Sequence, residues 1–399
     1  MKVLHLNKHE NTGGAAVATK RVHEGLLEMG IDSEMLVERT ATDDSTARSR
    51  SRLPNKISSI ARFAIDKIIS INTNSFSTGL VPSRVHQHIN TNEYDITHLH
   101  WLGDGYLNIV DIAKIETPLV WTLHDMWPIT GGCHYSDSCD RYENNCGNCP
   151  VLGSSSSDDL SSYIHRKKSR QWSNIDVHFV APSHWMAESA RSTGIIDQPE
   201  VSVIPNGIDT SRYCPDSGNN IIKNNEKIKI LFGAISATSD PRKGYDLLTK
   251  ALNNLNNPED YCCIVFGDDN PNLGDLDLEI QSYGYLSEES LISLYGDCDV
   301  MVVPSRYESF GQTVIEALAC GTPVVAFDAT GPKDIIKSKK TGYLAEPYDT
   351  TDLCAGIEWV TRNTERCEKL GRAAREDAVT RFAIETIAQQ YVELYESIC

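Results

Sequence analysis

The feature that most constrains the fold is an alternation of short apolar segments with amphipathic segments, and this alternation runs twice along the chain. In the first half the apolar segments are KVLHL (2–6), SEMLV (33–37), ITHLHW (96–101), PLVWTLH (118–124) and VHFVAPS (177–183). After about residue 197 they are VSVIPNGID (201–209), KIKILFGAI (227–235), YCCIVFG (261–267), DVMVVPS (299–305) and PVVAFDA (323–329). Short apolar segments alternating with helical ones are typical of parallel strands joined by crossover helices. The sequence therefore predicts an α/β protein with two successive doubly wound sheets.

The domain limits follow from where the alternation restarts. We expect a first Rossmann-like domain over residues 1–196 and a second over residues 197–380. The last segment, 381–399, is amphipathic and predicts one helix, which can cross back to the first domain.

Charge and hydropathy exclude several classes of protein. The 399 residues include 37 Lys plus Arg and 55 Asp plus Glu, a net charge of −18, which argues against a nucleic-acid partner. No apolar run reaches the roughly 18 residues of a membrane span, and the N-terminus turns polar too soon for a signal peptide. We expect a cytoplasmic protein, with association at the inner face of the membrane left open.

The segment PSRYESFGQTVIEALACGTPVVAFDATG (304–331) carries the clearest chemistry. Glu308 follows a buried strand, and a turn through Phe310 and Gly311 leads into a helix that contains Glu316. Ligands of open α/β sheets bind beyond the carboxyl ends of strands, and a helix N-terminus there suits a diphosphate. The alternative is a pair of ordinary glutamates at a helix end.

This segment closely resembles the signature of the retaining glycosyltransferases of family 4, which have the GT-B fold. The resemblance spans nearly the whole chain and includes VIPNGID (203–209), DPRKG (240–244) and YGYLSEESLISLYGDCDVMVVPS (283–305). It implies two Rossmann-like domains facing each other across a cleft and a nucleotide-sugar donor on the second domain.

The resemblance assigns roles in the second domain. Lys243 corresponds to the lysine that holds the donor diphosphate, and Glu308 to the glutamate that contacts the donor sugar. The remaining donor-binding candidates are Phe310 and Gly311 between sugar and phosphate, Glu316 on the ribose, and Tyr285 and Leu286 around the base.

One departure concerns the second cation of the donor site. Many relatives have an arginine after the glycine that ends the first strand of this domain, whereas this chain reads Gly233-Ala234-Ile235. Arg242 can supply that charge, or Ser236 and Thr238 can donate hydrogen bonds instead.

In the first domain, Gly13 and Gly14 resemble the glycine loop that lies against the donor phosphates. His124, followed by Asp125, ends a strand and corresponds to the family histidine that bonds the donor sugar. We therefore take Glu308, Lys243 and His124 as the catalytic candidates. His98 and His100 share one face of a strand, where packing or support of the site are equally open.

Two Asp-x-Asp triplets raise the question of a metal-bound nucleotide sugar. They are Asp275 with Asp277 and Asp297 with Asp299. In so acidic a chain such triplets arise by chance, so we expect no catalytic metal.

Four cysteines cluster with the spacing C-x5-C-x6-C-x2-C at Cys133, Cys139, Cys146 and Cys149. The closing C-x2-C is typical of a zinc knuckle, and four thiolates would make a closed structural site. Two disulfides or reduced thiols are the alternatives, and His134 is an alternative ligand. The cluster resembles an insertion found in a subset of family 4 enzymes.

Residues 48–70 predict a basic amphipathic helix. The cations are Arg48, Arg50, Arg52, Lys56, Arg62 and Lys67, against one acid, Asp66. Such a helix is typical of binding to an anionic membrane surface, and the alternative is a helix packed on the domain.

These inferences predict a retaining glycosyltransferase that uses a UDP-sugar, or next a GDP-sugar. The resemblance further implies a lipid-linked saccharide acceptor in bacterial O-antigen, capsule or exopolysaccharide synthesis. The alternatives are a non-catalytic scaffold of the same fold and a sugar-nucleotide epimerase.

Overall fold

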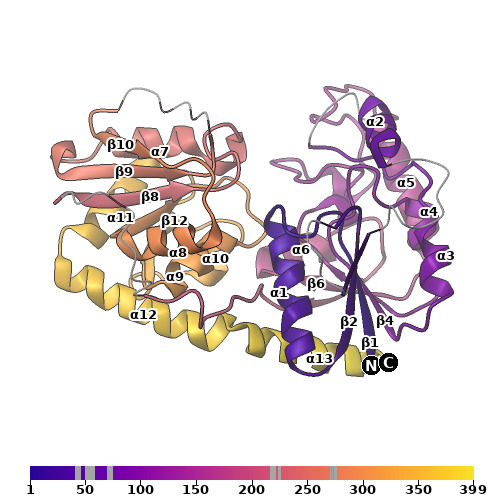
Figure 1. The fold of residues 1–399 in the computed structure, drawn as a ribbon. Coiled ribbons are helices and arrows are strands. Elements are labelled where there is room, and N and C mark those ends of the chain that lie inside the picture. The colour runs from indigo at the N-terminus through magenta and orange to yellow at the C-terminus, as the bar shows by residue number, and fades with distance from the viewer. Residues whose placement is uncertain are drawn as a thin grey trace. The chain divides into compact units, whose positions relative to one another are not determined.

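The computed structural model describes residues 1–40, 46–49, 59–69, 75–215, 222, 226–269, 271, 273 and 276–399. The chain divides into two compact units, drawn in Figure 1. Unit 1 comprises Met1–Pro205 and Ile387–Cys399, and unit 2 comprises Asn206–Thr386. Each unit has its own parallel sheet, which confirms the predicted α/β architecture with two successive doubly wound sheets.

Unit 1 is built on a seven-stranded sheet in the order β3-β2-β1-β4-β5-β6-β7. Its strands are β1 (Lys2–Leu6), β2 (Asp32–Val37), β3 (Ala47–Ser49), β4 (Ile96–Leu99), β5 (Leu119–Thr122), β6 (Val177–Ala181) and β7 (Glu200–Val203). The direction of the strand order reverses between the neighbours β1 and β4. The central strands are buried on both faces, as a parallel sheet covered by helices requires.

Helices cover both faces of this sheet. The helices of unit 1 are α1 (Gly14–Glu28), α2 (Ser59–Ile69), α3 (Val85–Asn90), α4 (Ile109–Ile112), α5 (Leu160–Trp172), α6 (His184–Arg191) and most of α13 (Ile384–Ile398), and α2 contacts loops beyond the strands. On one face Trp121 of β5 packs with Trp127 and Trp172. On the other, Val3 and Val120 pack against α1 and α13.

The strand that we predicted to open the second domain instead closes the first sheet. β7 pairs in parallel with β6, with Val201 opposite Phe179. The boundary therefore lies after Pro205 and not after residue 196, because the main-chain hydrogen bonds of β7 are satisfied by unit 1.

Unit 2 is built on a six-stranded sheet in the order β10-β9-β8-β11-β12-β13. Its strands are β8 (Ile228–Gly233), β9 (Tyr261–Phe266), β10 (Glu279–Ser282), β11 (Val300–Val303), β12 (Val324–Phe327) and β13 (Gly342–Ala345). Its helices are α7 (Tyr245–Leu252), α8 (Glu288–Asp297), α9 (Gln312–Ala319), α10 (Pro332–Ile335), α11 (Thr350–Thr361) and α12 (Thr364–Phe382). Here the strand order reverses between β8 and β11.

The last helix, α13, returns the chain to unit 1, so that both chain ends lie on that unit (Figure 1). Tyr391 and Tyr395 are fully buried against its sheet. The Tyr395 hydroxyl lies 2.6 Å from Nδ1 of His98, and the Tyr391 hydroxyl lies 3.1 Å from Oγ1 of Thr122. The return begins at Ile387 and not at residue 381, because α12 and the start of α13 still pack on unit 2.

No helix in the described part of the chain combines the length and the apolar character that crossing a bilayer requires.

Candidate functional site

A pocket opens where the strand order of unit 2 reverses. β8 and β11 lie side by side, and their carboxyl ends at Gly233 and Val303 form its floor. The pocket is lined by Phe232, Gly233, Ala234, Lys243, Val302, Val303, Pro304, Ser305, Glu308 and Thr313. This is the place where open α/β sheets bind their ligands, because the two loops leave the sheet in opposite directions.

Lys243 and Glu308, both predicted site residues, meet in this pocket. Nζ of Lys243 donates a hydrogen bond to Oε2 of Glu308 at 2.6 Å. Their side chains are 21% and 19% exposed, so each can still reach a ligand. A pocket with one ammonium and one carboxylate at such close range can hold a phosphate and a hydroxyl of the same molecule.

The loop that carries Lys243 is fixed by its own turn chemistry. Lys243 ends a short 3-10 helix, Pro241–Lys243, whose N-cap Asp240 accepts a hydrogen bond from the Arg242 amide at 3.0 Å. Gly244 follows with a φ of 71°, a left-handed conformation that favours glycine. A Cβ at Gly244 would lie 2.0 Å from the carbonyl oxygen of Pro304. The absence of a side chain at Gly244 therefore lets the two pocket loops lie this close together.

Arg306, which the sequence reasoning missed, ties the same two loops. Its guanidinium donates to the Pro241 carbonyl at 2.9 Å and makes a two-point ion pair with Asp246 at 2.7 Å. Its backbone amide donates to the carbonyl of Arg242 at 2.8 Å. Arg306 therefore joins the loop that carries Lys243 to the loop that carries Glu308. The only signal in the sequence was its position two residues before Glu308.

Arg242 does not line the pocket with Lys243. Its guanidinium is engaged by Asp240, with Nε and Nη2 donating at 3.1 and 2.6 Å. Burial raises the pKa of Asp240, but the hydrogen bonds and charge of Arg242 outweigh it, so that the pKa is lowered overall. Of the other proposed donors, the Ser236 amide donates to the Gly267 carbonyl and the Thr238 hydroxyl donates to Asp268.

Helix α9 starts at the rim of the pocket. Its N-cap is Gly311, with a φ of 125° and no side chain capping the first turn. The neighbouring Phe310 is buried and packs against Phe382, so only the main chain of this turn can face a ligand. Uncapped amides at a helix start attract an anion, and here they begin one residue before the pocket-lining Thr313.

The remaining donor-binding candidates lie outside the lining of the pocket. Glu316 is buried on α9 and accepts a hydrogen bond from the Tyr295 hydroxyl of α8 at 2.9 Å. Tyr285 is 55% exposed, and its amide donates to Asp269 at 3.2 Å. Leu286 packs against the core of unit 2. Tyr295 was not recognised from the sequence, because nothing local distinguishes it from a core tyrosine.

In unit 1 the glycine loop starts α1 in the same manner. Gly13 is its N-cap, with a φ of 93° and no side-chain cap, and Gly14 is its first residue. A Cβ at Gly13 would meet nothing within 4 Å, so the conformation and not crowding calls for glycine. The first turn of α1 is thus a second uncapped helix start, beyond the end of β1.

His124 and Asp125 have different surroundings. His124 is half-buried, with Nε2 3.0 Å from Nδ1 of His100, and burial lowers its pKa to about 4. The Asp125 carboxylate is buried and accepts from the Trp101 indole and from Nδ1 of His134, both at 2.6 Å. Asp125 therefore links the segments of Trp101 and His134 within unit 1. Of the two neighbours, His124 is the one whose side chain stays partly exposed and can contact a ligand.

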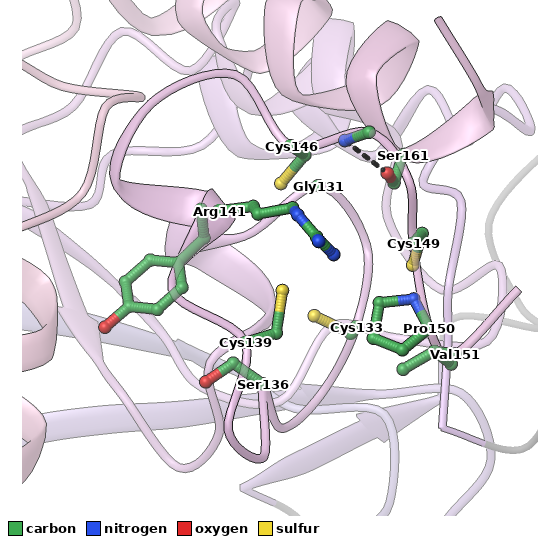
Figure 2. Close-up of a pocket in the computed structure, with 12 residues that line it drawn as sticks. Gly131, Cys133, Ser136, Cys139, Arg141, Cys146, Cys149, Pro150, Val151 and Ser161 are labelled. Carbon is green, nitrogen blue, oxygen red and sulfur yellow. Dashed lines mark hydrogen bonds between the residues drawn. The ribbon is translucent and has the colours of Figure 1, made fainter. Parts of the chain in front are cut away.

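The four clustered cysteines line one pocket of unit 1, shown in Figure 2. All four are free thiols, and Arg141 points among them. Burial raises the pKa of Cys133 and Cys146 to about 12. Among the described residues, the one group of three or more ligand atoms within 4.8 Å of one another is His5, His98 and His100, so no three of the four sulfurs lie that close together. His134 is committed elsewhere, because its ring nitrogens contact Asp125 and Ser77.

Two of the cations that we predicted on the basic face of α2 are paired within unit 1. Arg62 is buried and pairs with Glu38 at 2.5 Å, and Lys67 pairs with Asp104 at 2.9 Å. The exposed side chains are apolar: Ile60, Phe63, Ala64, Ile65, Ile68 and Ile69. Arg48 pairs with Glu34, and the predicted cations Arg50, Arg52 and Lys56 lie outside the described residues.

None of the described aspartates of the Asp-x-Asp triplets lines either pocket. The Asp299 carboxylate accepts a hydrogen bond from the Lys229 amide at 2.7 Å, which places it between neighbouring strands. Asp297 ends α8, and Asp275 lies outside the described residues.

Comparison with known proteins gives concordant matches. A family model described as Glycosyltransferase Family 4 matches residues 12–212, and one described as Glycosyl transferases group 1 matches residues 219–377. The MMP alpha-(1->4)-mannosyltransferase of Mycolicibacterium hassiacum is 28% identical over 76% of this chain and 71% of its own. WcaC of Escherichia coli K12, named provisionally for colanic acid biosynthesis, is 23% identical over 61% of this chain and 62% of its own.

A solved structure matches along the whole chain. Anabaena Alr3699/HepE, in complex with UDP and glucose, aligns with a TM-score of 0.68 and 19% identity, covering 100% of each chain. At that identity the likeness shows the fold alone.

The close approach of Gly244 to Pro304 predicts how a substitution at Gly244 affects the protein. Gly244→Ala forces a Cβ onto the Pro304 carbonyl at a positive φ, so we expect a loss of stability of about 1–3 kcal/mol, together with weaker ligand binding. Thermal unfolding of the variant measures the first effect. Gly296→Ala is the control, because a Cβ there meets nothing within 4 Å. Equal melting temperatures for the two variants would contradict the close approach.

Proposed function

The chain belongs to glycosyltransferase family 4 and is a glycosyltransferase that uses a nucleotide-sugar donor, and we propose that the donor binds in the pocket at the β8–β11 switch point and that transfer retains the anomeric configuration. The observation that carries the proposal is the Lys243–Glu308 pair, held at 2.6 Å beside the uncapped start of α9. The Lys243 ammonium and the amides at the start of α9 can bind a diphosphate, and the Glu308 carboxylate can bind a sugar hydroxyl.

The proposed reaction is a substitution on one face of the sugar. The bond between the anomeric carbon and the phosphate oxygen breaks, and the acceptor hydroxyl oxygen bonds to that carbon from the same face. The departing phosphate oxygen takes the proton of the acceptor hydroxyl. Lys243 and the α9 amides stabilise the charge that grows on the diphosphate, and Glu308 accepts a hydrogen bond from a sugar hydroxyl.

Uridine is our first choice for the nucleoside, and guanosine is the second. The matching Anabaena fold was solved with UDP and glucose, which supports a UDP-sugar. In this proposal Glu316 accepts from the ribose hydroxyls, with Tyr295 fixing its carboxylate, and residues 285–286 lie against the base. On unit 1, the start of α1 at Gly13 faces phosphate and His124 bonds the sugar.

For the acceptor we propose a lipid-linked saccharide of a bacterial surface polysaccharide. The support is the similarity to WcaC and the apolar surface of α2. O-antigen, capsule and exopolysaccharide all remain within this proposal.

The donor-site roles predict strong effects of two substitutions. Glu308→Ala and Lys243→Met should each lower kcat/KM for sugar transfer at least tenfold, about 1.4 kcal/mol of transition-state stabilisation. Lys250→Met is the matched control, because Lys250 is exposed at the end of α7. Transfer rates are measured with the donor identified by nucleotide binding. Wild-type rates in Glu308→Ala would remove this carboxylate from the mechanism.

We also propose that the four cysteines hold one structural zinc ion. The residues fit such an ion in chemistry: four free thiols line one pocket, and main-chain amides contact the sulfurs of Cys146 and Cys149. The buried side chain of Lys168 lies nearby. Burial lowers its pKa to about 7, and the negative charge of thiolates at Cys133 and Cys146 would raise that pKa and favour the ammonium form. Zinc–sulfur bonds of about 2.3 Å require the sulfurs to turn inward.

Zinc binding predicts one zinc ion per chain by elemental analysis of protein purified without chelator. Cys149→Ser should lose the metal and lower the melting temperature, because a closed structural site contributes to folding. Cys367→Ser, at a half-buried thiol of unit 2, should retain the metal. Metal-free wild-type protein with fewer than twelve titratable thiols after denaturation would instead indicate disulfides.

We propose, finally, that α2 rests on the surface of a lipid bilayer. Ile60 and Ile68 are 68% and 72% exposed, and each can bury an apolar side chain worth about 1.5–3 kcal/mol. The sequence just before α2 is basic, which favours an anionic headgroup region.

Liposome flotation tests the surface role of α2. We expect wild-type protein to float with vesicles of phosphatidylglycerol and phosphatidylethanolamine, and Ile60→Glu/Ile68→Glu to stay in the soluble fraction. Val379→Glu, an exposed apolar position on α12, should float like wild type. Equal flotation of all three proteins would contradict a role of α2.

A further inference from the structure

Three histidines form a hydrogen-bonded row inside unit 1 that ends at His124. Nδ1 of His5, on β1, lies 3.0 Å from Nε2 of His100, just beyond β4. Nδ1 of His100 lies 3.0 Å from Nε2 of His124, just beyond β5. His5 and His100 are 0% and 3% exposed, whereas His124 is half-buried. The row therefore runs from the core to a candidate site residue.

The row can carry hydrogen atoms in only two arrangements. Burial lowers the pKa of His5 and of His100 well below the ordinary value, so both rings are neutral. A neutral imidazole has one N–H donor and one bare acceptor nitrogen. Both contacts in the row join an Nδ1 to an Nε2, so all three rings carry hydrogen on Nδ1 or all three carry it on Nε2.

The surroundings of His5, at the buried end of the row, decide between these two arrangements. Nε2 of His5 is buried and has no hydrogen-bond partner among the described residues. A buried N–H without a partner is rarer in proteins than an under-satisfied acceptor. The hydrogen of His5 therefore belongs on Nδ1, where it is donated to His100.

We propose that His5 and His100 are positioning residues that hold His124 as the Nδ1–H tautomer, so that His124 offers an N–H donor to an oxygen of the donor sugar. This inference rests on the proposed function, in which His124 meets the sugar. With Nε2 occupied by the row, His124 donates a hydrogen bond and does not act as a base. The ligand group opposite it must be an oxygen that accepts.

The neighbouring His98 does not belong to the row. Its Nδ1 contacts the Tyr395 hydroxyl at 2.6 Å and its Nε2 contacts Oγ1 of Thr122 at 2.7 Å. Ligand atoms of His5, His98 and His100 come within 4.8 Å of one another, as they would around a metal ion. Hydrogen bonds occupy both nitrogens of His98 and both of His100, which favours the hydrogen-bonded row.

Nitrogen-15 NMR of the histidine-labelled full chain, without substrate, tests the row directly. Imidazole nitrogen shifts report the tautomer, and His124→Gln identifies the His124 signals. We expect Nδ1–H at His124 in the wild type and a change of tautomer or a mixture in His100→Leu. His98→Gln is the matched control, because it disturbs the same core face and leaves the row intact. Wild-type His124 in the Nε2–H form would overturn the proposal, as would an unchanged tautomer in a folded His100→Leu.

Kinetics separates positioning from packing. His100→Asn keeps an N–H near the position of Nδ1, so it should retain more kcat/KM than His100→Leu, which should lose at least tenfold. If both variants lose the same activity while their melting temperatures match, the row does not act through hydrogen bonding. If His124→Gln transfers sugar at the wild-type rate while the NMR result holds, the proposed role of His124 fails and the row survives.

Discussion

The candidate donor site depends on one constraint, the reversal of strand order between β8 and β11. At that point the loop after β8 and the loop after β11 leave the sheet in opposite directions, and a pocket opens between them. Lys243 arrives on one loop and Glu308 on the other. The contact of Gly244 with Pro304 and the bonds of Arg306 then bring their charged ends to 2.6 Å. Main-chain contacts and the side chain of Arg306 thus position the two charged groups.

Unit 1 has a different character, since polar side chains form much of its interior near the ends of β1, β4 and β5. Asp125 binds Trp101 and His134, and in this way anchors the cysteine segment to the sheet. The His98–Tyr395 contact fastens the returning helix α13. Buried polar groups stabilise a single arrangement only when their partners are in place, so these contacts fix the loops around His124 more tightly than apolar packing alone would.

The residues best predicted from the sequence are those whose role depends on local context. Glu308 lies in the loop after β11 and Lys243 in the loop after β8, each within a short motif, and the structure brings them into one pocket. The partners of these residues could not be predicted in the same way. Arg306 with Asp246 and Glu316 with Tyr295 are separated by 60 and 21 residues, and their pairing exists only in the folded sheet. The same holds for the histidine row, which joins three separate strands.

Helical periodicity also has a limit that α2 illustrates. It indicates which side chains share a face, but not which face lies inward. The sequence left open whether α2 binds a membrane surface or packs on the domain. In the structure Glu38 and Asp104 pair with Arg62 and Lys67, so these cations face the domain and the apolar side chains are exposed. The predicted domain boundary before β7 was wrong for a related reason. A strand at a domain junction has the same sequence pattern whether it joins the first sheet or the second.

The central claim is that the β8–β11 pocket binds a nucleoside diphosphate. A thermal-shift panel with UDP, GDP, ADP and CMP on the purified full chain, with and without EDTA, tests it most directly. A nucleotide at one hundred times its dissociation constant stabilises the protein by about 2.7 kcal/mol, which raises the melting temperature measurably. We predict that one nucleotide raises the melting temperature more than the others, with UDP as our first choice and GDP as our second. EDTA should leave this shift unchanged, and Lys243→Met should reduce it. No stabilisation by any of the four nucleotides would contradict the claim.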